Sequence, residues 1–160
     1  MTATAIKVEL RNVKYAAFAS QETSCFEATV YMDGRKSLTV RNGGTGGDNY
    51  WYDIIPGATK ELKAYAATLP PVDYDGTKLD MDAGLLVGEL LDAWLVERDV
   101  KRKLAKSVCF TKKGAVGVFT FSVKYSPDVA AQIRTKRSDI DKILQELPLT
   151  EAVNLFTSKA

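Results

Sequence analysis

The chain has 160 residues, of which 46% are hydrophobic, and this size and composition fit one globular domain with a continuous core. The 22 Lys and Arg residues against 20 Asp and Glu residues leave a formal charge of +2, so no overall field directs the chain to nucleic acid or to a membrane surface. Histidine is absent, which removes the commonest general base and the commonest metal ligand. We therefore expect a single domain over residues 1–160 that is not an enzyme and has no cofactor and no bound metal.

The two cysteines, Cys25 and Cys109, each lie in an apolar run, as reduced cytosolic thiols commonly do, so we expect no disulfide framework. The first residues do not follow the pattern of a signal peptide, and no apolar stretch approaches the roughly 20 residues that span a bilayer. These features favour a cytoplasmic protein with no membrane partner.

In chain order, alternation of apolar and charged residues first predicts a strand over Ile6 to Val13. Ser20 to Ser24 connects this strand to a second one, Cys25 to Met32, which ends at Asp33-Gly34. That dipeptide favours a two-residue hairpin turn into a third strand, Arg35 to Arg41.

A glycine-rich loop comes next, and the aromatic run from Tyr50 to Ile55 predicts a short fourth strand. Pro56-Gly57 breaks the chain before a helix over Ala58 to Ala67. Residues Val72 to Met81 are expected to form an acidic connection.

Apolar residues at helical spacing then predict the longest helix, from the Asp82 region to Lys106. Beyond it, we expect a second hairpin, formed by Val108–Phe110 and Ala115–Tyr125. Two helices should follow, Asp128–Lys136 with Ser126 as its cap and Ser138–Pro148 opened by Ser138. The last element is a final turn over Thr150–Phe156, capped by Thr150. Helices and hairpins are segregated along the chain. This order predicts an α+β fold with a mostly antiparallel sheet built from two hairpins and covered by helices on one side.

The segment "RNGGTGGDNYWYD", Arg41 to Asp53, is the strongest candidate for a binding site. Glycines let backbone N–H groups converge on an anion, and neighbouring tyrosine rings offer a surface for stacking a base. The spacing matches neither a P-loop nor a dinucleotide fingerprint. A flexible connection beside core and surface aromatics is the alternative. The predicted ligand-binding residues are Arg41, Asn42, Gly43, Gly44, Gly46, Gly47, Asn49, Tyr50 and Tyr52.

Two further patterns have simpler explanations. Four acids, Asp73, Asp75, Asp80 and Asp82, supply oxygen ligands but do not follow the EF-hand order, so a solvated loop with a helix cap is expected. Basic clusters occur at two helix ends, where the helix dipole favours cations; they are Lys101, Arg102, Lys103 and Lys106, and Arg134, Lys136 and Arg137.

Three runs, "CFEATVYMDGRK", "RNGGTGGDNY" and "DKILQELPLTEA", together resemble small accessory proteins encoded by bacteriophages and related mobile elements. The resemblance carries no activity and no site residue over to this chain. It implies a protein made in the host cytoplasm during infection, which acts by binding something of the host.

The leading hypothesis is therefore a non-enzymatic, phage-type binding protein that counteracts a host defence by sequestering a phosphorylated small molecule such as a nucleotide through the glycine-rich loop. One alternative is an interaction module that docks on a host protein and inhibits it. Another is a nucleic-acid binder that uses the basic helix ends, a partner that we do not expect because no aromatics are interleaved with the clusters. Self-association into a homo-oligomer is also considered.

Overall fold

A computed structural model describes residues 5–158 of the chain. The chain divides into two compact units, an N-terminal unit up to Asp92 and a C-terminal unit from Ala93. The boundary falls inside the long helix α2, Ala83–Lys106, which the sequence predicts correctly. The expectation of a single domain over residues 1–160 stays a prediction.

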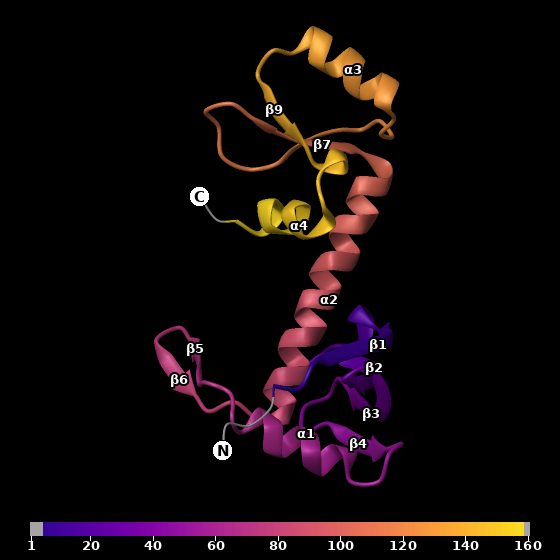
Figure 1. Cartoon of the computed structure of the whole chain (residues 1–160), viewed down its shortest axis with the longest axis vertical. Helices are drawn as coiled ribbons and strands as arrows, with labels where there is room; N and C mark the ends of the chain where they lie inside the picture. Colours follow the sequence, from indigo (N-terminus) through magenta and orange to yellow (C-terminus); the bar gives the residue numbers. More distant parts are fainter. Residues whose placement is uncertain (1–4, 159–160) are drawn as a thin grey trace. The chain divides into compact units, whose positions relative to one another are not determined.

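The N-terminal unit contains a four-stranded antiparallel sheet whose strands follow one another in chain order (Figure 1). Its strands are β1 (Val8–Tyr15), β2 (Cys25–Met32), β3 (Arg35–Gly43) and β4 (Tyr50–Asp53). The hairpin between β2 and β3 turns at Asp33 and Gly34, which adopt φ values of 51° and 77°. The turn predicted from this dipeptide is confirmed, because both positions need the left-handed backbone that Asp and Gly tolerate.

One face of this sheet forms the core of the N-terminal unit. Ala28 and Val30 of β2 and Leu38 and Val40 of β3 are buried on that face. Helix α1 (Ala58–Ala66) contacts β3 and β4 and contributes buried residues of its own. The opposite face, which we call the outer face, carries charged side chains such as Glu27 and Arg41 and the rings of Tyr50 and Tyr52.

Helix α1 begins where the sequence predicts, but its capping group comes from β4. The Asp53 carboxylate accepts hydrogen bonds from the backbone N–H groups of Gly57, at 2.9 Å, and Thr59, at 2.8 Å. The Thr59 hydroxyl and backbone hydrogen bonds lower the pKa of Asp53 from its ordinary value of 3.8. The ionised carboxylate thus fixes the end of β4 against the first turn of the helix.

The segment expected to be an acidic connection contains a small hairpin, β5 (Val72–Tyr74) with β6 (Thr77–Leu79). Its turn lies at Asp75 and Gly76, with φ values of 50° and 82°, and the Asp73 carboxylate accepts the Gly76 N–H at 2.8 Å. The prediction of an irregular loop was wrong because Asp-Gly here closes a hairpin whose strands are only three residues long.

The C-terminal unit contains a three-stranded antiparallel sheet in the order β8, β7, β9. The strands are β7 (Val108–Lys112), β8 (Phe119–Phe121) and β9 (Ile140–Ile143). A helix over Ser138 to Pro148 was predicted, but the structure has β9 followed by a 3-10 turn, η2 (Leu144–Glu146). The helix prediction was wrong because Ile140 and Ile143 are buried in the core by pairing with β7, a long-range contact that a local pattern does not reveal.

Two helices complete this unit. Helix α3 (Pro127–Lys136) is capped as predicted, since the Ser126 hydroxyl accepts the Val129 N–H at 3.1 Å. Helix α4 (Leu149–Thr157) begins before Thr150, at the turn after Pro148, so the predicted Thr150 cap was wrong.

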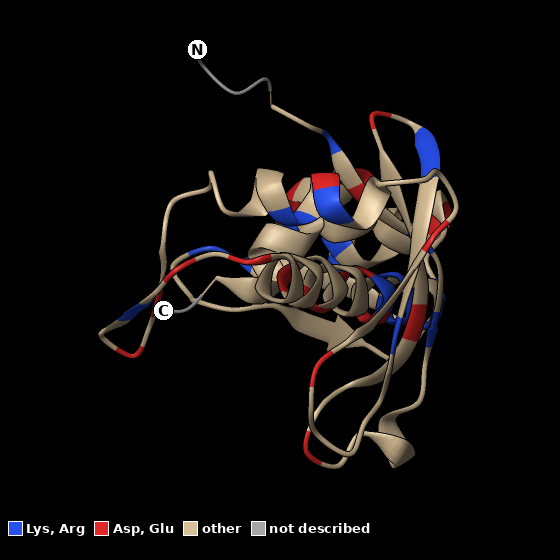
Figure 2. Ribbon diagram, turned by 90° about the horizontal axis from the view of Figure 1, so that it is seen from below, with Lys and Arg blue, Asp and Glu red and all other residues tan. Residues whose placement is uncertain are grey.

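The α+β class and the antiparallel pairing are confirmed. The two predicted hairpins lie in different sheets rather than in one, and a third, two-stranded sheet lies between them in the chain. Acidic and basic residues are interspersed along the ribbon (Figure 2). In the described part of the chain, no helix combines the length and the apolar composition needed to cross a bilayer.

Candidate functional site

The glycine-rich loop is organised around the side chain of Asn42, which is only 7% exposed. Its Oδ1 accepts the Gly44 N–H at 2.9 Å and the Thr23 hydroxyl at 2.6 Å. Its Nδ2 donates to the Gly47 carbonyl at 3.2 Å and to the Asn49 side chain at 3.1 Å. Asn42 therefore uses all of its hydrogen-bonding capacity inside the protein and acts as a structural centre of the loop.

The loop also interlocks with the connection between β1 and β2. The Gly44 carbonyl accepts the N–H groups of Gln21, at 2.9 Å, and Glu22, at 3.0 Å. The Gly46 N–H donates to the Thr23 hydroxyl at 3.3 Å. The N–H groups of Gly44 and Gly46 are thus engaged within the chain, which differs from the expectation that they would be donors to a bound anion.

The concave side of this loop has the wrong charge for a phosphate. A cavity of about 530 Å³ lies beside Asn42, Gly47 and Asn49. Four carboxylates line it, from Glu22, Asp48, Asp82 and Asp92, and no Lys or Arg is among its lining residues. In residues 5–158 no group of acidic residues and cysteines is arranged to hold a metal ion. An anionic ligand would be repelled here.

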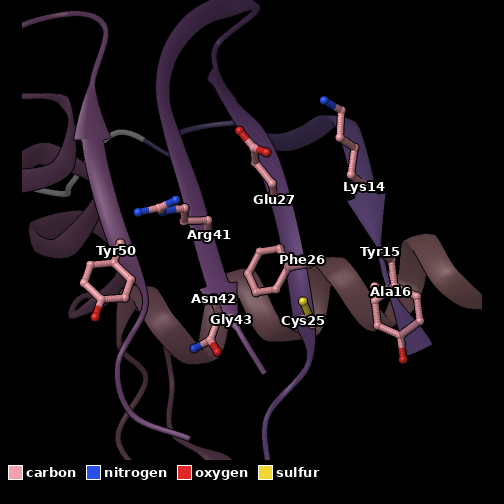
Figure 3. Close-up of a pocket in the computed structure, with 10 residues that line it drawn as sticks. All are labelled: Lys14, Tyr15, Ala16, Cys25, Phe26, Glu27, Arg41, Asn42, Gly43 and Tyr50. Atoms are coloured by element: carbon pink, nitrogen blue, oxygen red, sulfur yellow. The ribbon is translucent and has the colours of Figure 1, made fainter. Parts of the chain in front are cut away.

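A second cavity, of about 550 Å³, lies over the outer face of the four-stranded sheet (Figure 3). A row of four paired residues, one from each strand, crosses the sheet at this point. We call it the outer row, and it consists of Lys14, Glu27, Arg41 and Tyr50. Because paired residues of neighbouring strands point to the same face, the four side chains stand beside one another.

The structure brings only part of the predicted site to this cavity. Arg41, Asn42, Gly43 and Tyr50 line it, whereas the remaining glycines belong to the interlocked loop. The residues that sequence reasoning missed are Lys14, Tyr15, Ala16, Cys25, Phe26 and Glu27. A period-two pattern marks Lys14 and Glu27 as outward-facing, but only the strand register places them beside Arg41.

Arg41 is the centre of the outer face. Its guanidinium carbon lies 5.6 Å from the centroid of the Tyr50 ring and 5.7 Å from that of Tyr52, and its Nη2 lies 3.3 Å from the Tyr52 hydroxyl. No carboxylate of the described residues forms an ion pair with Arg41 or Lys14. Lys14 and Arg41 stand two strands apart, about 10 Å, with Glu27 between them. The outer row thus offers two cations, one acceptor and a 60% exposed aromatic ring.

Three residues of the two basic clusters, Lys101, Arg134 and Arg137, form ion pairs with carboxylates of the C-terminal unit. The Arg134 guanidinium donates to Glu146 at 2.9 and 2.6 Å, and this hydrogen bonding lowers the pKa of the Glu146 carboxyl. Arg137 is held in the same way by Asp139, at 3.1 and 2.8 Å. Both guanidinium groups are held by carboxylates of the same unit. Arg134 and Arg137 therefore add little to a surface for nucleic-acid phosphates.

Neither cysteine suggests covalent chemistry. Cys109 is buried, and burial raises the pKa of its thiol, which keeps the sulfur protonated and unreactive. Cys25 lies at the edge of the outer cavity, and both thiols are free.

Comparison of the chain with protein-family models, with curated proteins and with solved structures gives no match. The fold and the outer face are therefore the observations from which a function is inferred.

Proposed function

We propose that the protein is a non-enzymatic binding protein that holds a nucleotide-like phosphorylated ligand on the outer face of the N-terminal sheet. The observation that carries this proposal is the outer row, in which Arg41 stands between Glu27 and Tyr50, and Lys14 stands beyond Glu27, at a cavity of about 550 Å³. That volume is within the range of pockets for small ligands.

Each group of the outer row matches one part of such a ligand. The Arg41 fork donates two parallel hydrogen bonds to a phosphate, and Lys14 adds a second positive charge two strands away. The exposed Tyr50 ring provides a face on which a base stacks. Glu27 accepts a hydrogen bond from a ribose hydroxyl or an exocyclic amine, and its negative charge limits the total phosphate charge that the site accepts.

The role of the glycine-rich loop changes in this proposal. Gly43 lines the edge of the cavity, while the interlocked residues beyond it hold the end of β3 in place. The loop supports the site, and the charged side chains of the strands hold the anion. In the phage setting that the sequence resemblance implies, a protein of this kind sequesters a nucleotide signal of a host defence.

This proposal predicts that nucleotides raise the melting temperature of the native chain, whereas the nucleoside without phosphate does not. A ligand at about 100 times its Kd adds about 2.7 kcal/mol to the free energy of unfolding. We expect Arg41→Ala to weaken binding at least about tenfold, because a bidentate charged contact is lost. A thermal-shift titration with adenosine, its monophosphate and its triphosphate measures both effects.

Arg35→Ala is the matched control, since Arg35 is an exposed arginine of the same strand and does not line the cavity. Its shift with nucleotide should equal that of the native chain. A native chain whose melting temperature is unchanged by about 1 mM of every nucleotide tested would rule out the proposed site.

A second candidate function is docking on a host protein, and one residue favours it. Phe18, in the short turn η1 (Ala17–Ala19), is 93% exposed. The Ser20 hydroxyl holds this turn, donating to the Ala16 carbonyl and accepting the Cys25 N–H, both at 2.8 Å. A fully exposed aromatic ring on a fixed turn is suited to fill a pocket of another protein.

For this candidate we expect a bacterial lysate to yield one stoichiometric partner that binds the native chain and is lost with Phe18→Ser. Phe121→Ser is unsuitable as a control because Phe121 packs on a core. Val116→Ser, at an exposed apolar position of the C-terminal unit, serves instead and should retain the partner.

A further inference from the structure

The two edges of the four-stranded sheet differ in their protection against pairing with another strand. On the β1 edge, the register shifts between Arg11 and Lys14, and Asn12 adopts a φ of 54°. Charged side chains also follow one another along that strand. Such bulges and charges are common means of blocking edge-to-edge association. The β4 edge, Tyr50–Asp53, pairs regularly with β3 and contains neither a lysine nor a proline.

The backbone of β4 directs hydrogen-bonding groups away from the sheet. Ile54 N–H donates to Ser37 O at 2.9 Å, and the register pairs Tyr52 with Thr39. In an antiparallel ladder, hydrogen-bonded and non-hydrogen-bonded pairs alternate, so Tyr52 and Ile54 direct their backbone groups to β3. The N–H and C=O groups of Trp51 and Asp53, which lie between these positions, point away from β3. Within residues 5–158, no hydrogen bond joins these four groups to another part of the chain.

The same strand exposes large apolar surface. Tyr50 and Tyr52 share the outer face and are 60% and 50% exposed, and Ile54, directly after the strand, is also exposed. A free strand edge that carries exposed aromatic rings is a surface for β-strand addition.

We propose that β4 pairs antiparallel with β4 of a second copy of this chain, about a two-fold axis that passes beside Tyr52. Only the register that places Trp51 opposite Asp53 of the second copy uses all four outward groups on each strand, which gives four intermolecular hydrogen bonds. The two sheets then continue as one eight-stranded antiparallel sheet. This inference stands on the strand edge alone and does not depend on the proposed ligand.

The charges next to the edge match this register. The Lys63 ammonium lies 5.9 Å from the centroid of the Trp51 ring, on the core side of the strand. In the paired dimer Asp53 of the second copy stands opposite Trp51 on that same side, so each Lys63 has a carboxylate of the other copy nearby. On the outer face the two Tyr52 side chains meet in a non-hydrogen-bonded pair, with Cα atoms about 4.5 Å apart.

Charge substitution at Tyr52 tests the pairing, because this residue meets its own copy at the axis. In sedimentation equilibrium at about 100 µM chain, a range suited to a small interface, we expect the native protein to approach twice its 17.6 kDa monomer mass. Tyr52→Lys and Tyr52→Glu should each weaken dimerisation at least tenfold through like-charge repulsion. An equimolar mixture of the two variants should recover the dimer, since opposite charges then meet.

Thr39→Lys is the matched control. Thr39 pairs with Tyr52 on the outer face but lies one strand inside the edge, so the two new lysines of a dimer would stand about 14 Å apart, beyond the screening length at physiological salt. Its dimer should persist. A native chain that stays monomeric at about 100 µM overturns the proposal, as does a dimer that Tyr52→Lys leaves intact or a mixture of the variants that stays monomeric. Circular dichroism confirms that each variant is folded.

Discussion

Gly44→Ala is expected to lower the free energy of unfolding of the N-terminal unit by about 3 to 5 kcal/mol. Gly44 adopts a φ of 84°, which strains any residue with a Cβ. A Cβ at this position would also overlap the Ala19 carbonyl oxygen and lie 2.8 Å from the Cys25 Cβ. The interlocked loops leave no space for the methyl group, so strain and overlap add.

Gly47→Ala separates these two effects. Gly47 lies in the same loop and has the same φ of 84°, but no atom of the described residues, other than its own and those of its two chain neighbours, lies within 4 Å of the position that its methyl group would take. Its substitution should therefore show the backbone strain alone, about 1 to 2 kcal/mol. Urea unfolding, followed by Trp51 fluorescence in a background that lacks Trp94, measures both variants. Equal losses for the two would contradict the interlocked arrangement.

Phe110→Ala should destabilise the C-terminal unit by about 3 to 5 kcal/mol, the usual effect of removing a buried phenylalanine. Phe110 is 2% exposed, and its ring centroid lies 4.9 Å from that of Phe121 and 6.0 Å from that of Phe119. Truncation leaves a cavity in the core cluster that Phe110 forms with Val108, Ala130, Ile140 and Ile143. Val116→Ala, at an exposed position, is the control and should change stability by less than about 0.5 kcal/mol.

Unfolding of Phe110→Ala also tests the prediction that residues 1–160 form one domain. Each unit has its own fluorescent reporter, because Trp51 lies in the N-terminal unit and Trp94 in the C-terminal unit. Urea unfolding of Phe110→Ala is followed in variants that retain only one tryptophan. If residues 1–160 form a single cooperative domain, both reporters shift to the same lower midpoint. A shift confined to Trp94 would show that the two units unfold independently.

The elements that the sequence predicts best are those whose local signals agree with their environment. Asp33-Gly34 turns a hairpin and Ser126 caps α3, because in each case the residue satisfies a backbone requirement within a few positions. Helix α2 is predicted from apolar residues that recur at helical spacing over many turns.

Long-range contacts decide the elements that were missed. Strand β9 has a local pattern that permits a helix, and its pairing with β7 determines the outcome. The candidate site shows the same limit. Arg41 and Tyr50 are adjacent to the glycine-rich loop in sequence and were found, whereas Lys14 and Glu27 join them only through strand register. Likewise, Thr23 and Asn42 are 19 positions apart, so their hydrogen bond is not visible in the local sequence.

The interlocking of residues 19–24 with residues 42–49 also has a consequence for how this protein can change. Two segments that share one hydrogen-bonding centre are not independent targets for mutation. A side chain at Gly44 would overlap the Ala19 carbonyl oxygen, so it fits only if the backbone at Ala19 also changes. Libraries that diversify one segment while holding the other constant will lose most members to misfolding. Joint randomisation of both segments, as a single paired unit, is the route by which this end of the sheet can accept new side chains.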